Sequence, residues 1–177
     1  MSEPPKKKID QESLRLYSKT MATRWEQAEL YTMITPTTPI FVYCTLMLPW
    51  VLARVLNITD YDGIEEMIGY TTRATLQSYF RTQVKTAGMP TIVHTTQEAA
   101  VDGILIGGLE PHAMAKIDTY IGPGLLKKET VEVEIELRDG NKVKVAALTY
   151  VWDGPMETLE AKHWTPLDFM RDGSPEA

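Results

Sequence analysis

The chain of 177 residues is poor in thiol and imidazole groups: it contains one cysteine, Cys44, and three histidines. A single cysteine excludes an internal disulfide framework and a cysteine-based metal cluster, and it fits a reducing compartment. The histidines are His94, His112 and His163, and no two of them have the i, i+4 spacing of a helical metal site. We therefore expect no metal, no cofactor and a cytoplasmic location.

Long apolar runs and glycine-rich phosphate loops are also missing. No stretch approaches the ~20 apolar residues that cross a membrane, and residues 1–11 lack the apolar segment of a secretory signal. A net charge of −6 argues against a general nucleic-acid binder. The glycines at 107–108 and 122–124 suit turns and fit no nucleotide fingerprint. We expect a soluble protein with a small-molecule substrate, which binds neither nucleic acid nor a membrane.

The overall amino-acid composition, 44% hydrophobic and 24% charged residues, is typical of a folded domain. Residues 1–38 predict a disordered N-terminus and then one helix, capped by Asp10 and ending before residue 35. Residues 39–177 predict a domain with an irregular C-terminal tail, which Trp164 and Phe169 anchor. We expect the helix to pack on the outside of the domain. A homodimer through this helix, with Trp25 in the contact, is the alternative.

The clearest strand covers residues 130–137, where apolar side chains alternate with three glutamates. A turn at 139–140 and a returning strand at 142–152 place lysines across from those glutamates. We interpret the glutamate row as a solvated face and not as a catalytic cluster. The whole pattern predicts an α+β fold with a largely antiparallel, curled sheet. Further strands are expected at 40–43, 66–80, 90–94 and 101–106, and helices at 49–56 and 111–120.

Several short segments, taken in order, resemble one family. Residues 40–47, IFVYCTLM, look like the Tyr-Gly-Ser/Thr-Leu motif of the γ-glutamylcyclotransferase-like, or AIG2-like, proteins. Residues 89–93, 101–105 and 147–152 are similar to that family's Tyr-Pro-Ala-Ile-Val, Val-x-Gly and Tyr-Val-Trp segments. The likeness extends from residue 40 to residue 169. It implies a small, mostly antiparallel β-barrel with flanking helices and a cavity at its mouth.

The resemblance also implies a binding site. In the family, the first loop presents backbone N–H groups at a helix start to the α-amino acid end of a γ-glutamyl substrate. Free N–H groups and a helix dipole can hold a carboxylate in this way. We call the matching residues 43–47 the corner loop and expect them to bind substrate. They are Tyr43, Cys44, Thr45, Leu46 and Met47.

The chain departs from the family's pattern in two places. Cys44 stands where the family has Gly, so the loop carries a Cβ that narrows the pocket floor or reshapes the turn. The family's Leu-Asp-x-x-Glu-Gly pattern corresponds to IDTYIG here, which puts Ile121 in place of the general acid/base glutamate. Leu126 and Lys128 stand in its next pattern, Tyr-x-Arg. Ile cannot carry a proton, whereas a positioned carboxylate typically supplies ~100- to 10,000-fold in rate.

Other side chains could replace the missing carboxylate, and the catalytic residue is unknown from sequence. Glu110 is the first candidate because it precedes the helix that should border the cavity, although we prefer to explain it as a helix-start residue favoured by the macrodipole. We prefer a solvent-facing role for Glu129 and a structural hydrogen bond for Asp118. Cys44 could be a nucleophile with a histidine, His94 or His112, as its base. Since the sequence places neither beside it, we interpret Cys44 as a turn residue that shapes the pocket.

Three functions are compatible with these features. We prefer an AIG2-like enzyme repurposed to lyase, isomerase or cyclisation chemistry on a less polar metabolite, since Ile121 and nearby aromatic rings would make the cavity more apolar. The second is a γ-glutamylcyclotransferase that releases 5-oxoproline with a relocated acid. The third is a non-catalytic domain that binds a metabolite or a protein. The aromatic candidates are Tyr43, Trp50, Tyr70, Tyr79, Tyr120 and Tyr150.

Overall fold

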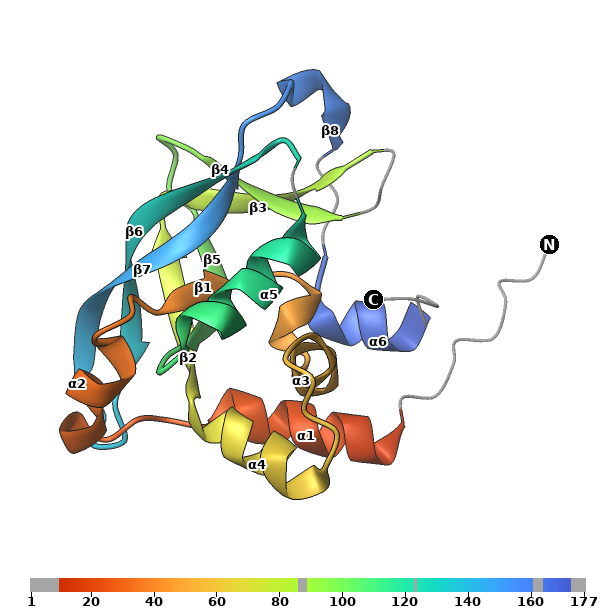
Figure 1. The fold of residues 1–177 in the computed structure, drawn as a ribbon. Coiled ribbons are helices and arrows are strands. Elements are labelled where there is room, and N and C mark those ends of the chain that lie inside the picture. The colour runs from red at the N-terminus through yellow and green to blue at the C-terminus, as the bar shows by residue number, and fades with distance from the viewer. Residues whose placement is uncertain (1–9, 86–88, 123, 161–163, 173–177) are drawn as a thin grey trace.

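The computed structural model describes residues 10–85, 89–122, 124–160 and 164–172. Five strands close into a barrel in the order β1-β5-β2-β6-β7 (Figure 1). All neighbouring strands are antiparallel except β1 and β7, whose parallel pairing closes the barrel. The predicted α+β fold with a mostly antiparallel barrel is therefore confirmed. The strands are β1 (Ile40–Val42), β2 (Thr71–Gln77), β5 (Ala100–Ile106), β6 (Leu126–Glu136) and β7 (Lys142–Trp152).

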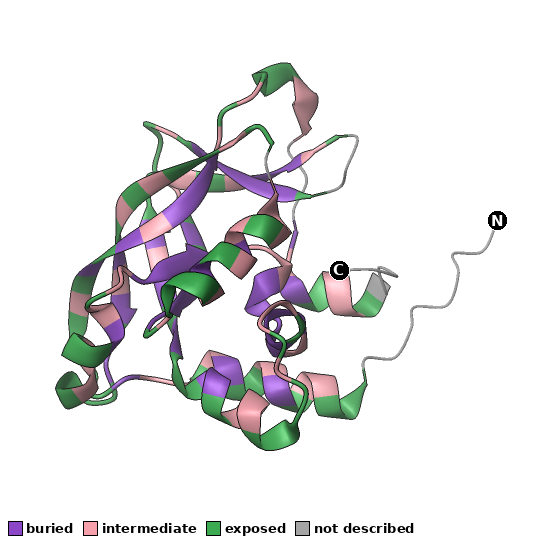
Figure 2. Cartoon of the chain, in the orientation of Figure 1, coloured by how far each residue is buried: buried purple, intermediate pink, exposed green. Residues whose placement is uncertain are grey.

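The longest hairpin, β6–β7, forms as its alternation predicts. Val133 and Ile135 are buried, while Lys144 lies opposite Glu134 and Lys142 opposite Glu136. Figure 2 shows the same alternation of buried and exposed residues along these strands. The charged pairs are exposed, so each contributes between 0 and about 1 kcal/mol. The glutamate row is a solvated face, as expected.

A second, three-stranded sheet in the order β4-β3-β8 packs beside the barrel. Its strands are β3 (Tyr79–Val84), β4 (Pro90–His94) and β8 (Leu159–Glu160). The remaining elements flank the two sheets. They are η1 (Thr45–Met47), α3 (Pro49–Val55), α4 (Tyr61–Gly69), α5 (Pro111–Ile121), η2 (Met156–Thr158) and α6 (Pro166–Asp172).

Helix α4 corrects one sequence prediction, which placed strands throughout residues 66–80. The Asp60 side chain accepts a hydrogen bond from the Gly63 N–H at 2.9 Å and caps the helix. Ile64, Met67 and Ile68 repeat at helical spacing and pack against the core. The prediction gave weight to Gly69 and the β-branched residues after it, but Gly69 is the last residue of the helix.

The N-terminal segment forms two helices, α1 (Gln11–Ala22) and α2 (Gln27–Ile34), so the prediction of one helix is wrong. Trp25 lies in the break between them and is fully buried. Its carbonyl accepts the Arg138 N–H at 2.9 Å, and a Cβ added to Gly107 would come within 3.0 Å of the Trp25 ring. The ring fills the barrel end nearest Gly107 and is not available to a second copy of the chain. The homodimer itself stays a prediction.

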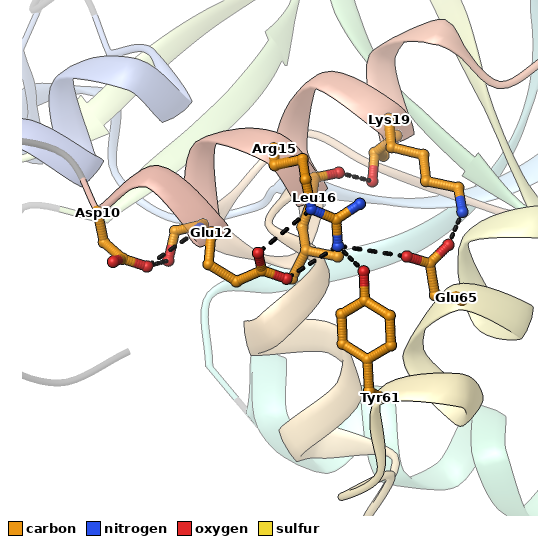
Figure 3. Close-up of polar contacts among 9 residues, drawn as sticks. Asp10, Glu12, Arg15, Leu16, Lys19, Tyr61 and Glu65 are labelled. Atoms are coloured by element: carbon orange, nitrogen blue, oxygen red, sulfur yellow. Dashed lines mark hydrogen bonds and ion pairs between the residues drawn. The ribbon is translucent and has the colours of Figure 1, made fainter.

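Helix α1 is joined to α4 by a network of ion pairs (Figure 3). Arg15 pairs with Glu12 at 2.8 Å and with Glu65 at 3.3 Å, and its guanidinium also hydrogen-bonds the Tyr61 hydroxyl. Lys19 pairs with the same Glu65 carboxylate. Asp10 caps α1 as expected, by accepting the Ser13 N–H. The network fixes α1 against the underside of the domain seen in Figure 1.

Two apolar cores result from this arrangement. One fills the barrel interior and contains Phe41, Leu105 and Val133. The other lies between the barrel wall and the helices, and it contains Ile104, Leu52 and Trp164. Trp164 and Phe169 anchor the tail, with ring centroids 6.4 Å apart. The tail was predicted to be irregular, but residues 166–172 form α6.

None of the helices among the described residues has both the length and the apolar character that a membrane crossing demands.

The burial of Trp25 makes it a test of the barrel-end packing. We predict that Trp25→Ala lowers the free energy of unfolding by about 3–5 kcal/mol, as large-to-small changes at fully buried aromatic sites do. Tyr31→Ala is the matched control, because this α2 side chain is 75% exposed. It should change stability by less than about 0.5 kcal/mol. Urea unfolding followed by circular dichroism measures both values, and equal stabilities for the two variants would contradict the packing described here.

Candidate functional site

The corner loop turns the chain sharply between β1 and α3. Cys44 has φ −108° and ψ −157°, so its backbone is extended. Any residue adopts this conformation, and glycine's freedom at positive φ is not needed at this position. The exchange of Gly for Cys therefore costs no backbone strain here. The exchange instead adds a side chain with a free thiol to the loop, which takes up space that a glycine would leave open.

Three residues of the corner loop have buried side chains. The Tyr43 hydroxyl donates to the Tyr150 backbone carbonyl at 2.6 Å. Leu46 and Met47 line a small apolar cavity of about 10 Å³ between the loop and helices α1 and α4. That volume is at or below what one water molecule needs, so the cavity is a packing defect and no ligand site. Tyr43 and Leu46 can therefore offer a ligand only their backbone groups.

Thr45 and Cys44 are the half-buried members of the corner loop. The Thr45 and Tyr120 hydroxyls form a 2.8 Å hydrogen bond, which brings the C-terminal end of α5 to the loop. Gly122 ends α5 at φ +87°, a left-handed conformation that glycine adopts without strain. The elements that the resemblance brings together, the first loop and the end of this helix, do lie side by side.

Ile121 is half-buried and packs against the core beneath the helices. The carboxylate of α5 that is nearest in sequence belongs to Asp118, three residues before Ile121. It accepts hydrogen bonds from the Tyr150 hydroxyl and from the Lys128 ammonium, the latter at 2.9 Å. Lys128 lies opposite Tyr150 in the β6–β7 register, with its ammonium 5.8 Å from that ring's centroid. Asp118 thus makes the structural hydrogen bonds expected from sequence.

Burial governs the ionisation of the groups around the loop. It raises the pKa of the Tyr43 and Tyr120 hydroxyls, and it raises that of Tyr150 together with the Asp118 carboxylate. Burial likewise raises the pKa of the Cys44 thiol, and only smaller contributions, from the Leu46 amide and Arg81 among others, oppose it. At neutral pH the loop is therefore surrounded by neutral hydroxyl and thiol groups.

Arg81 of β3 is the cation at this site, and the sequence analysis missed it because it belongs to no recognisable motif. Its Nη2 donates to the Asp102 carbonyl at 2.6 Å and contacts the Met47 sulfur at 4.0 Å. Its Nη1 donates to the Trp164 carbonyl at 3.3 Å, and the guanidinium lies 5.4 Å from the Trp164 ring centroid. Strand β3, the corner loop and the tail therefore meet at this side chain.

The remaining candidates lie elsewhere. Glu110 precedes the first residue of α5, is 75% exposed and pairs with His112 at 3.3 Å. His94 is exposed at the end of β4, with its ring centroid 5.3 Å from that of Tyr79. Among the described residues, no hydrogen bond or ion pair joins these groups to the corner loop. Glu129 is half-buried on β6, 4.0 Å from the Lys127 ammonium.

His163 lies outside the described residues. Of the aromatic candidates, Tyr43, Tyr120 and Tyr150 gather at the loop, whereas Tyr70 is 39% exposed beside Gly108. The described residues contain no group of three His, Cys, Asp or Glu side chains arranged to hold a metal ion.

A family model for gamma-glutamyl cyclotransferase, AIG2-like proteins matches residues 40–166, which is most of the chain. The chain belongs to the AIG2-like γ-glutamyl cyclotransferase family. The match begins at β1, so helices α1 and α2 precede the part that family members share. None of the curated proteins compared with the chain matches it.

Two solution structures from Arabidopsis thaliana have a similar fold. The protein At3g28950.1 is 27% identical to this chain, with a TM-score of 0.52 over 74% of this chain and 71% of that one. The protein At5g39720.1 is 23% identical, with a TM-score of 0.53 over 75% of this chain and 80% of that one. The AIG2-like barrel fold is thus supported by both family and structure.

The buried Tyr43 hydroxyl predicts a loss of stability in alkali. The unfolded chain releases a tyrosine proton near pH 10, whereas the folded chain holds it, so the unfolded state is favoured increasingly above pH 10. Each such tyrosine lowers the free energy of unfolding by up to about 1.4 kcal/mol per pH unit. Tyr43→Phe should reduce this slope between pH 10 and 11.5, measured by urea unfolding. An unchanged slope would show that the Tyr43 hydroxyl ionises freely in the folded chain.

The enclosed thiol of Cys44 predicts slow alkylation. Because the thiolate is the reactive form, raising its pKa reduces the reactive fraction at pH 8. We expect iodoacetamide to modify Cys44 at least ~10-fold more slowly in the folded chain than in guanidinium-unfolded chain. Mass spectrometry follows the modification. A folded-state rate above the unfolded one would instead favour the nucleophile hypothesis.

Proposed function

We propose that this protein is an AIG2-like enzyme that binds a small metabolite at the corner loop and converts it without releasing 5-oxoproline. The reaction is a lyase, isomerase or cyclisation step on a substrate that is less polar than a γ-glutamyl amine. The observation that supports it best is the chemistry around the loop. Neutral hydroxyls surround it, and no carboxylate of the described residues hydrogen-bonds to it.

Release of 5-oxoproline needs a base that this arrangement does not readily provide. The substrate's α-amine must lose a proton before it attacks the γ-carbonyl, and the leaving amine must gain one. A carboxylate performs both steps efficiently when it is within hydrogen-bond reach. The Ile121 side chain has no acidic or basic group. The Asp118 carboxylate already accepts hydrogen bonds from Lys128 and from the Tyr150 hydroxyl.

Glu110 is poorly placed for the same task. It precedes α5, whereas the residue of α5 that contacts the loop is Tyr120, near the other end. Ten residues of helix separate them, which corresponds to roughly 15 Å along the axis. The exposed Glu110 carboxylate is also paired with His112. A role for Glu110 would therefore require the helix to move.

The groups that are present suit a different kind of chemistry. Tyr120 and Thr45 place two hydroxyls at the loop, and burial raises the pKa of the Tyr120 phenol, so it remains a hydrogen-bond donor. Such donors polarise a substrate carbonyl in a low-dielectric site, where they stabilise developing negative charge. Carbonyl polarisation serves elimination, isomerisation and ring closure equally well.

One observation favours a second candidate function. The Asp118 carboxylate bonds to Tyr150, whose backbone carbonyl holds Tyr43 in the corner loop. If Lys128 released Asp118, this carboxylate and the Tyr150 phenol could exchange a proton with a bound amine. In that case the protein would be a γ-glutamylcyclotransferase with a relocated acid.

An assay for 5-oxoproline release separates the two functions. We predict that the purified chain shows no detectable release from glutathione or γ-glutamyl amino acids. Ile121→Glu should raise the rate by ~100-fold or more if a carboxylate is what the site lacks. Ile121→Gln is the matched control: glutamine has the size of glutamate and forms hydrogen bonds, but its amide is not an acid or base near neutral pH, so this variant should gain no activity.

The opposite outcome is equally clear. Robust release by the unaltered chain would reject the proposal. Loss of that release in Asp118→Asn would then support the relocated acid at Asp118, whereas loss in Glu110→Gln would support Glu110. Circular dichroism of each variant must first show that the fold is intact.

A further inference from the structure

Arg81 carries a partly buried charge that makes no ion pair within 4.0 Å in the described part of the chain, and the Asp102 carboxylate acts on it only from beyond that distance. Its hydrogen bonds go to two backbone carbonyls, those of Asp102 and Trp164. No carboxylate of the described residues is within 4.0 Å of its nitrogens, and the Asp102 carboxylate instead accepts the Thr75 hydroxyl at 3.1 Å. A partly buried charge whose nearest carboxylate lies beyond ion-pair distance is costly to desolvate, and strongly perturbed charges of this kind gather at functional sites.

One of the guanidinium donors has no partner at all. The Nε–H of Arg81 is enclosed by the protein and makes no hydrogen bond. Buried donors are nearly always satisfied, so this one is an exception that a ligand oxygen could explain. Since Nη2, which points the same way as Nε, already donates to the Asp102 carbonyl and contacts the Met47 sulfur, a ligand carboxylate oxygen would accept from the Nε–H.

The position of Arg81 connects this unused capacity to the corner loop. Its Nη2 touches the Met47 sulfur, and its charge acts on the ionisation of Cys44 and Tyr43. The other face of the guanidinium is covered by the Trp164 ring. A ligand held here would place its charged group on Arg81 and the adjoining part on apolar side chains.

We propose that Arg81 binds the carboxylate of the substrate, and that the substrate is a small organic acid with an apolar remainder. The inference rests on the proposed function, because it assigns a substrate class to the same site. The apolar surroundings, Met47 and Trp164, favour a singly charged carboxylate over a phosphate, whose second charge would be more costly to desolvate. Arg81 thus determines which metabolites enter, while the hydroxyls of Thr45 and Tyr120 act on the uncharged part.

The test measures binding by NMR, with hexanoate, hexanamide and inorganic phosphate as probes of the full chain. The enclosed Nε–H of Arg81 should exchange slowly with water and give its own ¹H–¹⁵N signal, which Arg81→Lys identifies by removing it. Hexanoate is expected to shift this signal and the Thr45 and Leu46 amides. Hexanamide, equal in size but uncharged, should shift neither.

Two variants complete the design. Arg81→Lys keeps the charge but loses the Nε–H donor, so it should bind hexanoate at least ~10-fold more weakly. Arg73→Lys is the matched control, because Arg73 is an exposed arginine on β2, the strand that precedes β3 in the chain, and it should bind as the unaltered chain does. Circular dichroism establishes that both variants fold. If Arg81→Lys does not fold, the comparison of hexanoate with hexanamide on the unaltered chain decides the matter.

Several outcomes would overturn the inference: equal shifts by hexanoate and hexanamide, no shift by either, binding of phosphate in place of hexanoate, or unchanged affinity in folded Arg81→Lys. All of them are read from binding and not from turnover. Release of 5-oxoproline would reject the proposed function but leave carboxylate binding by Arg81 open to confirmation. Failure of hexanoate to bind would reject the role of Arg81 and leave the proposed reaction untouched.

Discussion

The site depends on how the short strand β1 is held in the barrel wall. Only three residues long, β1 pairs with β5 on one side and meets β7 in parallel on the other. Two further hydrogen bonds reinforce that closure. The Thr149 hydroxyl donates to the Phe41 carbonyl at 3.0 Å, and the Leu148 N–H donates to the Pro39 carbonyl at 2.9 Å. Since the chain leaves β1 directly into the corner loop, closing the barrel also positions the loop.

Once the loop is fixed, three other elements supply its surroundings. Helix α5 brings Tyr120 to Thr45, strand β7 brings Tyr150 to Tyr43, and strand β3 brings Arg81 to Met47. The result is a set of neutral hydroxyls, together with the Arg81 cation, around a strand-to-helix corner. That combination suits recognition of an anion and polarisation of a carbonyl better than it suits repeated exchange of a proton. The family scaffold is thus retained, and the difference that we propose lies in the chemistry of its corner.

The sequence predicted the elements whose pattern is purely local or whose motif is distinctive. The β6–β7 hairpin followed from strict alternation, and the barrel followed from the ordered motifs of the family. The prediction failed where one side chain had to leave a regular pattern for a tertiary reason. Trp25 continues a helical stripe in sequence, yet it fills the barrel end, and the helix breaks to let it do so. Arg81 could not have been found because its importance arises from an unpaired donor, which only the packed structure reveals.

The central claim is that the corner loop binds a small acidic ligand but does not release 5-oxoproline from a γ-glutamyl substrate. A time course of NMR spectra of hexanoate and γ-glutamylalanine mixed with the unaltered chain tests both halves in one sample. The account predicts that hexanoate shifts the corner-loop amides while the dipeptide signals persist unchanged for hours. Growth of 5-oxoproline signals, or shifts that leave the corner loop unaffected, would contradict it.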